Sequence, residues 1–166
     1  DVERCQLELI DTLSIDPESV IPVSAKTGVG VDSLLEHIVT DLPSPTGNEN
    51  NPLEALIFDS RFDSYRGVII LIRVFEGTIR VGDKIKFLSN GNTYQVTELG
   101  IRTPKEQKVD SLKAGEVGYL AASIKNIKDV QVGDTVTTTD NNGAKLLKGF
   151  RKTQPMVFAG LYPSDN

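Results

Sequence analysis

Apolar residues recur at a helical period in the first part of this chain and at a period of two further on. Over Val2–Leu13, and again over Val31–Leu42, they return every three or four residues, as on one face of a helix. The apolar run Val20–Val23 between them predicts a short strand. We therefore expect helix, strand, loop and helix, with Pro43 ending the second helix.

Beyond residue 52 the pattern changes to short stretches of strand-forming residues. Val68–Phe75 is rich in β-branched and aromatic residues, and Lys84–Phe87 and Thr93–Thr97 alternate polar with apolar side chains. Asn90 and Gly91 lie between the last two and suit a tight hairpin turn, which needs positive φ angles. Short strands with no helical pattern between them predict a small closed β-barrel.

One five-residue pattern occurs three times in this second part. An apolar residue, two others, a glycine and an acid follow one another at Ile79–Asp83, Leu112–Glu116 and Val130–Asp134. The glycine permits a left-handed or tightly bent backbone, and the acid can accept N–H groups of the turn before the next strand begins. We interpret the three copies as barrel turns rather than as a cation site.

Residues 43–52 separate the two patterns. Apart from three prolines they carry no apolar side chain, which predicts an exposed and fairly stiff linker. A domain boundary is therefore expected there.

Composition limits the classes of protein that fit. Hydrophobic residues make up 39% and charged residues 25%, as in a globular protein with a core. A lone Cys5 can form no internal disulfide, and with one His37 it leaves too few ligands for zinc, so we expect a reducing, intracellular compartment and no metal site. No apolar run approaches the roughly 20 residues of a membrane-spanning helix. The net charge of -5 argues against a general nucleic-acid binder and leaves room only for a local RNA contact.

The segment Val23–Gly28 stands between the predicted strand and the second helix, where open α/β sheets usually place a ligand loop. A purely structural turn fits the same residues. The segment also resembles the last guanine-binding motif of the GTPase fold. That resemblance implies that the Ala25 N–H donates to the guanine carbonyl oxygen, that Ser24 holds the loop, and that the Lys26 stem packs near the base.

The second part resembles the β-barrel domain of translational GTPases, and within that group the elongation factor 4 (LepA) family. The residues that carry the likeness are Ala55–Ser60, Asp63–Val68, Gly77–Ile85, Leu112–Tyr119 and Gln154–Pro163. The resemblance implies an α+β chain dominated by an all-β translation-factor barrel, called domain II in this family, and preceded by the C-terminal α/β part of a P-loop GTPase domain. The implied boundaries are 1–43 for the end of the GTPase domain, 44–52 for the linker, 53–142 for the barrel, and 143–166 for a further linker and the start of domain III.

The same resemblance implies a parent protein that binds GTP with Mg²⁺, hydrolyses it on the ribosome and promotes back-translocation of tRNAs and translational fidelity. Its partners would be the ribosome, through small-subunit RNA and tRNA-bound complexes, and GTP or GDP. The chain carries no Gly-x-x-x-x-Gly-Lys-Ser/Thr loop and no Asn-Lys-x-Asp. We therefore expect no catalytic residue, no metal ligand and no GTP binding by these residues alone. A cytoplasmic location is implied, and peripheral association with the inner face of the cell membrane stays open.

Five basic residues beside predicted loops are candidates for contact with ribosomal RNA, because guanidinium and ammonium groups bind phosphate. They are Arg61, Arg66, Arg102, Lys105 and Lys108. A solvated surface explains any one of them equally well. Phe62 and Tyr65 flank charges in the same loop, where they can stack on a base or pack on the barrel rim.

Two alternatives to this interpretation stay open. One is a segment of an elongation factor G-type translocase, which shares the barrel pattern. The other is a stand-alone β-barrel interaction module without nucleotide chemistry, in which the Ser24 loop is only a turn. The chain has no starting methionine, and the strand-like run Phe158–Tyr162 has no evident partner of its own, so we expect a middle piece of a longer protein.

Overall fold

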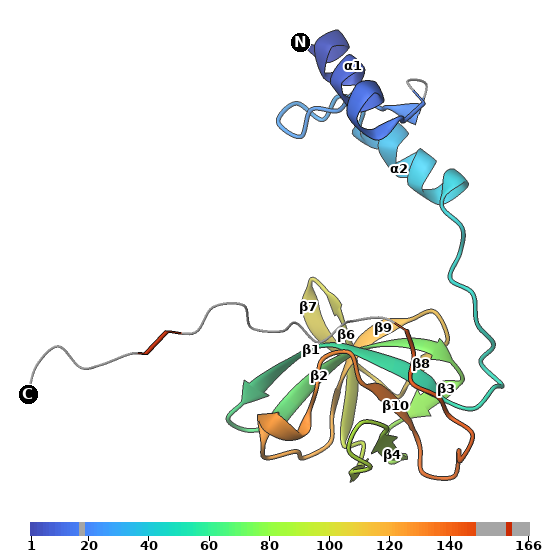
Figure 1. Cartoon of the computed structure of the whole chain (residues 1–166), viewed down its shortest axis with the longest axis vertical. Coiled ribbons are helices and arrows are strands. Elements are labelled where there is room, and N and C mark those ends of the chain that lie inside the picture. Colours follow the sequence, from blue (N-terminus) through green and yellow to red (C-terminus); the bar gives the residue numbers. More distant parts are fainter. Residues whose placement is uncertain (17–18, 149–158, 161–166) are drawn as a thin grey trace, which may run out of the picture. The chain divides into compact units, whose positions relative to one another are not determined.

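The computed structural model describes residues 1–16, 19–148 and 159–160. Their contacts divide into two compact units, one ending at Ser44 and one beginning at Pro45 (Figure 1). The two helices belong to the first unit, and the described strands all belong to the second. Most of residues 143–166, and with them most of the predicted run Phe158–Tyr162, lies outside the described residues.

Helices α1 (Val2–Leu13) and α2 (Val31–Asp41) form where the helical spacing predicts them. The Asp1 carboxylate caps α1 by accepting the Arg4 N–H at 3.2 Å, and the helix ends at Ser14 with φ 52°. Neither helix buries a side chain. Their apolar stripes are therefore not covered by the described residues of this unit.

The predicted strand Val20–Val23 is wrong. These residues have no regular secondary structure and lead into a turn that begins at Ala25. A strand needs a neighbouring strand to satisfy its backbone N–H and C=O groups. No strand among the described residues of the first unit can act as that neighbour. The β-branched residues alone therefore do not produce a strand.

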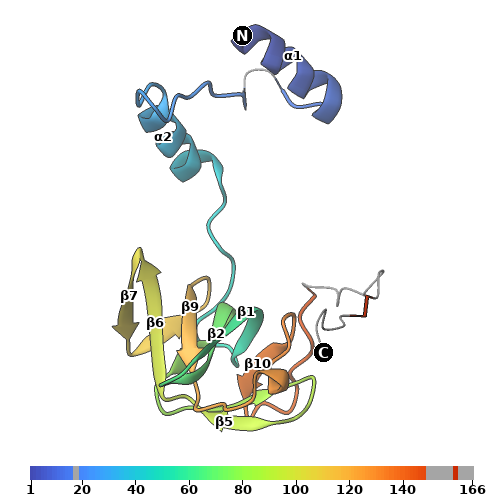
Figure 2. The same ribbon diagram turned by 90° about the vertical axis from the view of Figure 1, so that its left-hand side faces the viewer.

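The second unit is the barrel expected from the sequence (Figures 1 and 2). Its strands are β1 (Glu54–Asp63), β2 (Gly67–Glu76), β3 (Thr78–Arg80), β4 (Lys84–Phe87), β5 (Thr93–Gln95), β6 (Glu98–Thr103), β7 (Lys105–Val109), β8 (Ser111–Lys113), β9 (Val117–Ala121) and β10 (Thr135–Thr138). A curved antiparallel sheet has the order β5-β4-β10-β1-β2-β9-β6-β7, and β3 pairs with β8 in a small second sheet. A 3₁₀ turn covers Ile127–Asp129.

Alternate residues of β2 explain how the barrel fills its interior. Val68, Ile70 and Ile72 point inward and join a core to which β3 and β8 contribute Ile79 and Leu112. Ile69, between them, points to the outer face and is also fully buried, because it packs with Tyr119 and Ala121 of β9 in a second, smaller cluster. This outer cluster lies beneath the polar side chains that surround Arg66.

The predicted strands at Val68–Phe75, Lys84–Phe87 and Thr93–Thr97 are confirmed as β2, β4 and β5. The connection between β4 and β5 is longer than a two-residue hairpin turn. Its Gly91 has φ +74° and donates its N–H to the Phe87 carbonyl at 2.9 Å. Asn90 has no positive φ; its side chain instead accepts the Asn92 N–H at 2.9 Å.

The repeated glycine and acid pattern builds turns, as predicted. The glycines of the three copies have φ between 90° and 95°. In the first copy Asp83 accepts the Arg80 N–H at 2.8 Å, and in the second Glu116 accepts the Lys113 N–H at 2.7 Å. The acid of the third copy, Asp134, reaches another loop: it accepts the N–H and the hydroxyl of Ser89 at 3.0 and 2.5 Å.

The predicted linker is exposed, and from Pro45 onward it is also fastened to the barrel. Glu76, at the end of β2, accepts the Asn48 N–H at 2.8 Å and the Asn51 amide at 2.9 Å. Glu49 pairs with Lys113 of β8 at 2.8 Å. These contacts hold the segment along the edge of the barrel.

Candidate functional sites

The Ser24 loop is shaped by a small set of backbone hydrogen bonds. The Ser24 N–H donates to the Val29 carbonyl at 2.9 Å, and the Gly28 N–H donates to the Ser24 carbonyl at 2.8 Å. The Ser24 hydroxyl accepts the Thr27 N–H at 3.3 Å. Ser24 therefore closes the loop on itself with its main chain and its side chain together.

Gly30 connects this loop to α2. It has φ +77°, and a Cβ atom there would lie 2.4 Å from the Pro22 carbonyl oxygen, so only glycine fits. The close approach fixes where the loop turns into the helix. Ala25 and Lys26 stand exposed at its outer end, and the Ala25 N–H has no acceptor among the described residues. The loop thus presents a free backbone donor.

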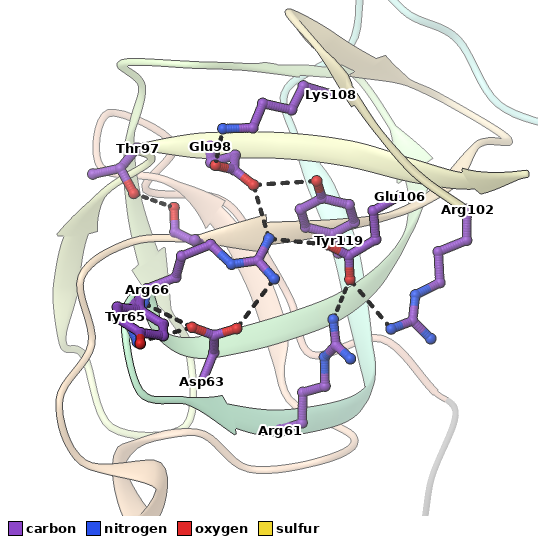
Figure 3. Close-up of polar contacts among 11 residues, drawn as sticks. Arg61, Asp63, Tyr65, Arg66, Thr97, Glu98, Arg102, Glu106, Lys108 and Tyr119 are labelled. Carbon is purple, nitrogen blue, oxygen red and sulfur yellow. Dashed lines mark hydrogen bonds and ion pairs between the residues drawn. The ribbon is translucent and has the colours of Figure 1, made fainter. Parts of the chain in front are cut away.

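A second candidate site lies on the outer face of the barrel, around Arg66 (Figure 3). The Arg66 guanidinium donates to Asp63 at 3.2 Å and to Glu98 and Glu106 at 3.0 Å each. These carboxylates come from β1, β6 and β7. Arg66 therefore ties the β1–β2 tip to the β6–β7 hairpin.

Glu98 and Glu106 each collect several donors. Glu98 also accepts the Tyr119 hydroxyl at 3.1 Å and pairs with Lys108 at 2.6 Å. Glu106 also pairs with Arg61 and, at 3.3 Å, with Arg102. We call these groups the outer-face network: Arg61, Asp63, Arg66, Glu98, Arg102, Glu106, Lys108 and Tyr119.

The outer-face network covers the small outer cluster of the barrel. The Arg66 guanidinium lies 5.8 Å from the centroid of the Tyr119 ring. That ring is 1% exposed and rests against Gly100 of the neighbouring strand β6, where a Cβ atom would lie 2.3 Å from the ring. Tyr119 thus packs between a bare stretch of backbone and a guanidinium.

The pKa values follow from these contacts. The hydrogen bond from Lys108 is the main reason that the pKa of Glu98 is lowered, and the hydrogen bond from Arg66 is the main reason for Glu106. The pKa of Asp63 is lowered chiefly because it accepts the Arg66 backbone N–H. Burial alone would lower the pKa of Arg66, but its carboxylate partners outweigh burial and raise it.

These lowered pKa values predict a loss of stability in acid. The pKa of Glu98 and Glu106 lies below the ordinary 4.5 in the folded barrel. The unfolded chain therefore binds protons first, and the stabilisation present above that value is lost as the pH falls through the folded pKa. We expect the free energy of unfolding in urea to fall as the pH is lowered below about 5. Glu98→Gln should flatten that dependence, and an equally steep curve for this variant would contradict the prediction.

The structure brings together four of the five residues predicted to contact RNA. Arg61, Arg66, Arg102 and Lys108 share one face, where three carboxylates balance their four positive charges incompletely. Lys105 begins β7 beside them, is exposed, and forms no ion pair with any residue that the structure describes. The face keeps a small positive excess.

Sequence reasoning missed the acidic half of this face and the part played by Tyr119. These contacts can be predicted only when the pairing of the strands is known. Arg102 and Glu106 stand opposite each other in the β6–β7 ladder, where opposite charges attract. Arg66 and Glu98 meet only because β2 and β6 both pair with β9.

The described residues contain neither a membrane-spanning helix nor a cluster of metal ligands. None of the helices there is long and apolar enough to cross a membrane. Histidine, cysteine and acidic side chains form no group of three or more that could hold a metal ion in the described part of the chain.

Comparison with known proteins confirms the resemblance to the elongation factor 4 (LepA) family and the translation-factor barrel. Residues 67–137 match the family model of elongation factor Tu domain 2. The chain is 52% identical over 166 residues to elongation factor 4 of Limosilactobacillus reuteri, and 53% identical over 163 residues to that of Phytoplasma mali. It spans 27% of the length of each of these relatives, and 100% and 98% of the chain is aligned.

Solved structures of translation factors share the fold. The chain resembles the elongation factor SelB of Methanococcus maripaludis with a TM-score of 0.62 and 25% identity, over 73% of this chain and 26% of that one. It resembles a bacterial selenocysteine-specific elongation factor with a TM-score of 0.63 and 22% identity, over 83% of this chain and 24% of the other. The second likeness is one of fold alone.

Proposed function

We propose that this chain, homologous along its whole length to elongation factor 4 proteins, is the part of a ribosome-dependent GTPase that links its nucleotide site to its ribosome contact. The observation that carries the proposal is the identity of about half of all residues to those relatives, over both units. We further propose that the whole protein acts in the cytoplasm and promotes back-translocation of tRNAs. Peripheral membrane association is not part of the proposal.

The Ser24 loop would supply one side of the guanine site. Its free and exposed Ala25 N–H suits the carbonyl oxygen of guanine, whereas adenine offers an amino group there and would set donor against donor. Ser24 holds the donor in place, and the exposed Lys26 stem is free to cover the base. Bound GTP would supply the phosphate that is cleaved. We do not propose that residues of this chain coordinate the magnesium ion.

The barrel would meet small-subunit RNA through its outer face. Arg61, Arg102 and Lys108 keep part of their side chains exposed within the outer-face network, and Lys105 is exposed beside it. Such groups can exchange a carboxylate for a phosphate partner. The Arg66 guanidinium already donates to three carboxylates. We therefore propose that Arg66 positions the tip between β1 and β2 and does not bind RNA directly.

The proposal is tested by GTP hydrolysis of the full-length protein with and without ribosomes. We expect strong stimulation by ribosomes, and no hydrolysis by the 166-residue chain, which lacks a phosphate loop. Ala25→Pro removes the proposed donor and should weaken GTP binding about tenfold. It should leave the affinity for 2-aminopurine riboside triphosphate, which has no carbonyl oxygen at that position, unchanged.

The hydrolysis measurement and the nucleotide-affinity measurement test separate parts of the proposal. Absence of hydrolysis by the full-length protein under both conditions would leave the barrel as a binding module. If the full-length protein hydrolyses GTP but Ala25→Pro loses equal affinity for both nucleotides, the Ser24 loop does not recognise guanine and is only a structural turn.

A further inference from the structure

The end of β1 and the connection that follows it each expose an aromatic ring. Phe62 is 61% exposed and Tyr65 is 98% exposed, whereas Tyr119 of the same barrel is 1% exposed. Aromatic side chains usually contribute most of their large surface to a core or an interface. Most of the Phe62 surface and nearly all of the Tyr65 surface is therefore available to a partner.

The tip that carries the rings is rigidly built. One oxygen of Asp63 accepts the N–H groups of Tyr65 and Arg66 at 2.9 Å each. Gly67 follows with φ +77°, and a Cβ atom there would lie 2.5 Å from the Ile124 carbonyl oxygen. Because these contacts hold the backbone of the tip, little backbone entropy is lost when a partner docks against the rings.

A cleft of about 350 Å³ opens beside the rings. Its lining residues are Phe62, Ser64, Tyr65, Arg66, Gly67, Ser123 and Lys125. None of these lining residues is acidic or aliphatic. Lys125 is exposed and forms no ion pair with any described residue, so its charge is free. Rings, hydroxyls and an unbalanced cation suit a nucleotide, which has an aromatic base, a ribose and a phosphate.

We propose that Phe62 and Tyr65 form a stacking platform for an unpaired base of RNA, and that Lys125 meets a neighbouring phosphate. The inference rests on the proposed contact between the barrel and small-subunit RNA, and it names the chemistry of that contact. A base inside a helix has both faces covered by its neighbours, so the platform selects a base that is flipped out or single-stranded. A protein partner could also use the rings, but the free charge of Lys125 and the absence of an acidic lining residue favour a partner that carries phosphate.

The first test measures the affinity of the full-length protein for vacant 70S ribosomes over a range of salt concentrations. The double variant Phe62→Ala with Tyr65→Ala should bind at least about fivefold more weakly at every salt concentration, because stacking carries no charge. Lys125→Ala should reduce the slope of log affinity against log salt by roughly one. Val132→Ala, at an exposed apolar residue of the same barrel that does not line the cleft, is the control and should bind as the wild type does.

A second pair of variants separates stacking from plain apolar contact. Phe62→Leu with Tyr65→Leu keeps apolar bulk without a ring, and we expect it to bind as weakly as the alanine pair. Tyr65→Trp keeps a ring and should retain affinity. Its added fluorescence, relative to the wild type, should be quenched by protein-free 16S rRNA as well as by ribosomes.

Four outcomes would overturn the inference. Unchanged ribosome affinity in the alanine pair would remove the rings from the contact. Full affinity in the leucine pair, or quenching by ribosomes but not by protein-free 16S rRNA, would indicate a ribosomal protein as the partner. If the wild type itself fails to bind ribosomes, the proposed function fails and the stacking site falls with it.

Discussion

Replacing Gly100 by alanine is expected to lower the free energy of unfolding of the barrel by about 3 kcal/mol, the upper part of the range for overpacking. The new Cβ atom would lie 2.3 Å from Cζ of Tyr119 and 2.4 Å from its hydroxyl oxygen. The ring has nowhere to retreat, because it is 1% exposed and its hydroxyl donates to Glu98 at 3.1 Å. Either the ring or strand β6 must move, and each movement breaks contacts of the outer-face network.

Urea unfolding of the 166-residue chain, followed by circular dichroism, measures this effect. Gly143→Ala is the matched control, because Gly143 lies in an exposed turn and its nearest neighbour to an added Cβ is 3.8 Å away. A cycle with Tyr119→Ala isolates the clash: Gly100→Ala should cost much less once the ring is gone. If Gly100→Ala costs as little as Gly143→Ala, or as much without the ring as with it, the packing argument is wrong.

The same pair shows which parts of the fold the sequence can predict. The stretch that became β2 was predictable because β-branched residues that fill a barrel leave a local signature. The contact of Gly100 with Tyr119 leaves none, since the two residues meet only through the β6–β9 ladder. A glycine within a strand pattern marks a close approach without saying what approaches.

The failure at Val20–Val23 has the opposite cause. The residues carry a local strand signature, but a strand is a property of two chain segments, and the described residues of the first unit offer no second one. The neighbouring Ser24 loop forms a turn because its hydrogen bonds are local. They join Ser24 to residues no more than five positions away. Local hydrogen bonds can therefore be predicted where pairing cannot.

The outer-face network shows the same limit for charges. Its basic members were predictable as cations beside loops, and their carboxylate partners were not. Arg102 and Glu106 are four residues apart, a spacing that suggests neighbours on a helix, yet they are cross-strand partners. For Phe62 and Tyr65 the sequence left stacking and rim packing open, and their exposure now favours a partner.

Asp134→Ala should cost about 3 kcal/mol of unfolding free energy, because it removes a charged acceptor that serves several donors. Asp134 is 3% exposed and accepts the Thr135 N–H at 2.7 Å, the Ser89 N–H at 3.0 Å and the Ser89 hydroxyl at 2.5 Å. Alanine would leave the buried Thr135 N–H without its acceptor and would break the tie to Ser89, whose loop would lose its anchor to the barrel.

The repeated turn pattern supplies the control for this prediction. Glu116 holds the same place in its copy but is exposed and accepts one described N–H, that of Lys113. Glu116→Ala should therefore cost less than about 1 kcal/mol, because water can satisfy the freed donor. Both costs are measured by urea unfolding at neutral pH. Equal costs would mean that the acid acts only within its own turn. A larger cost at Asp134 is expected because its carboxylate joins the end of one turn to the loop after β4, a contact that the turn pattern by itself does not require.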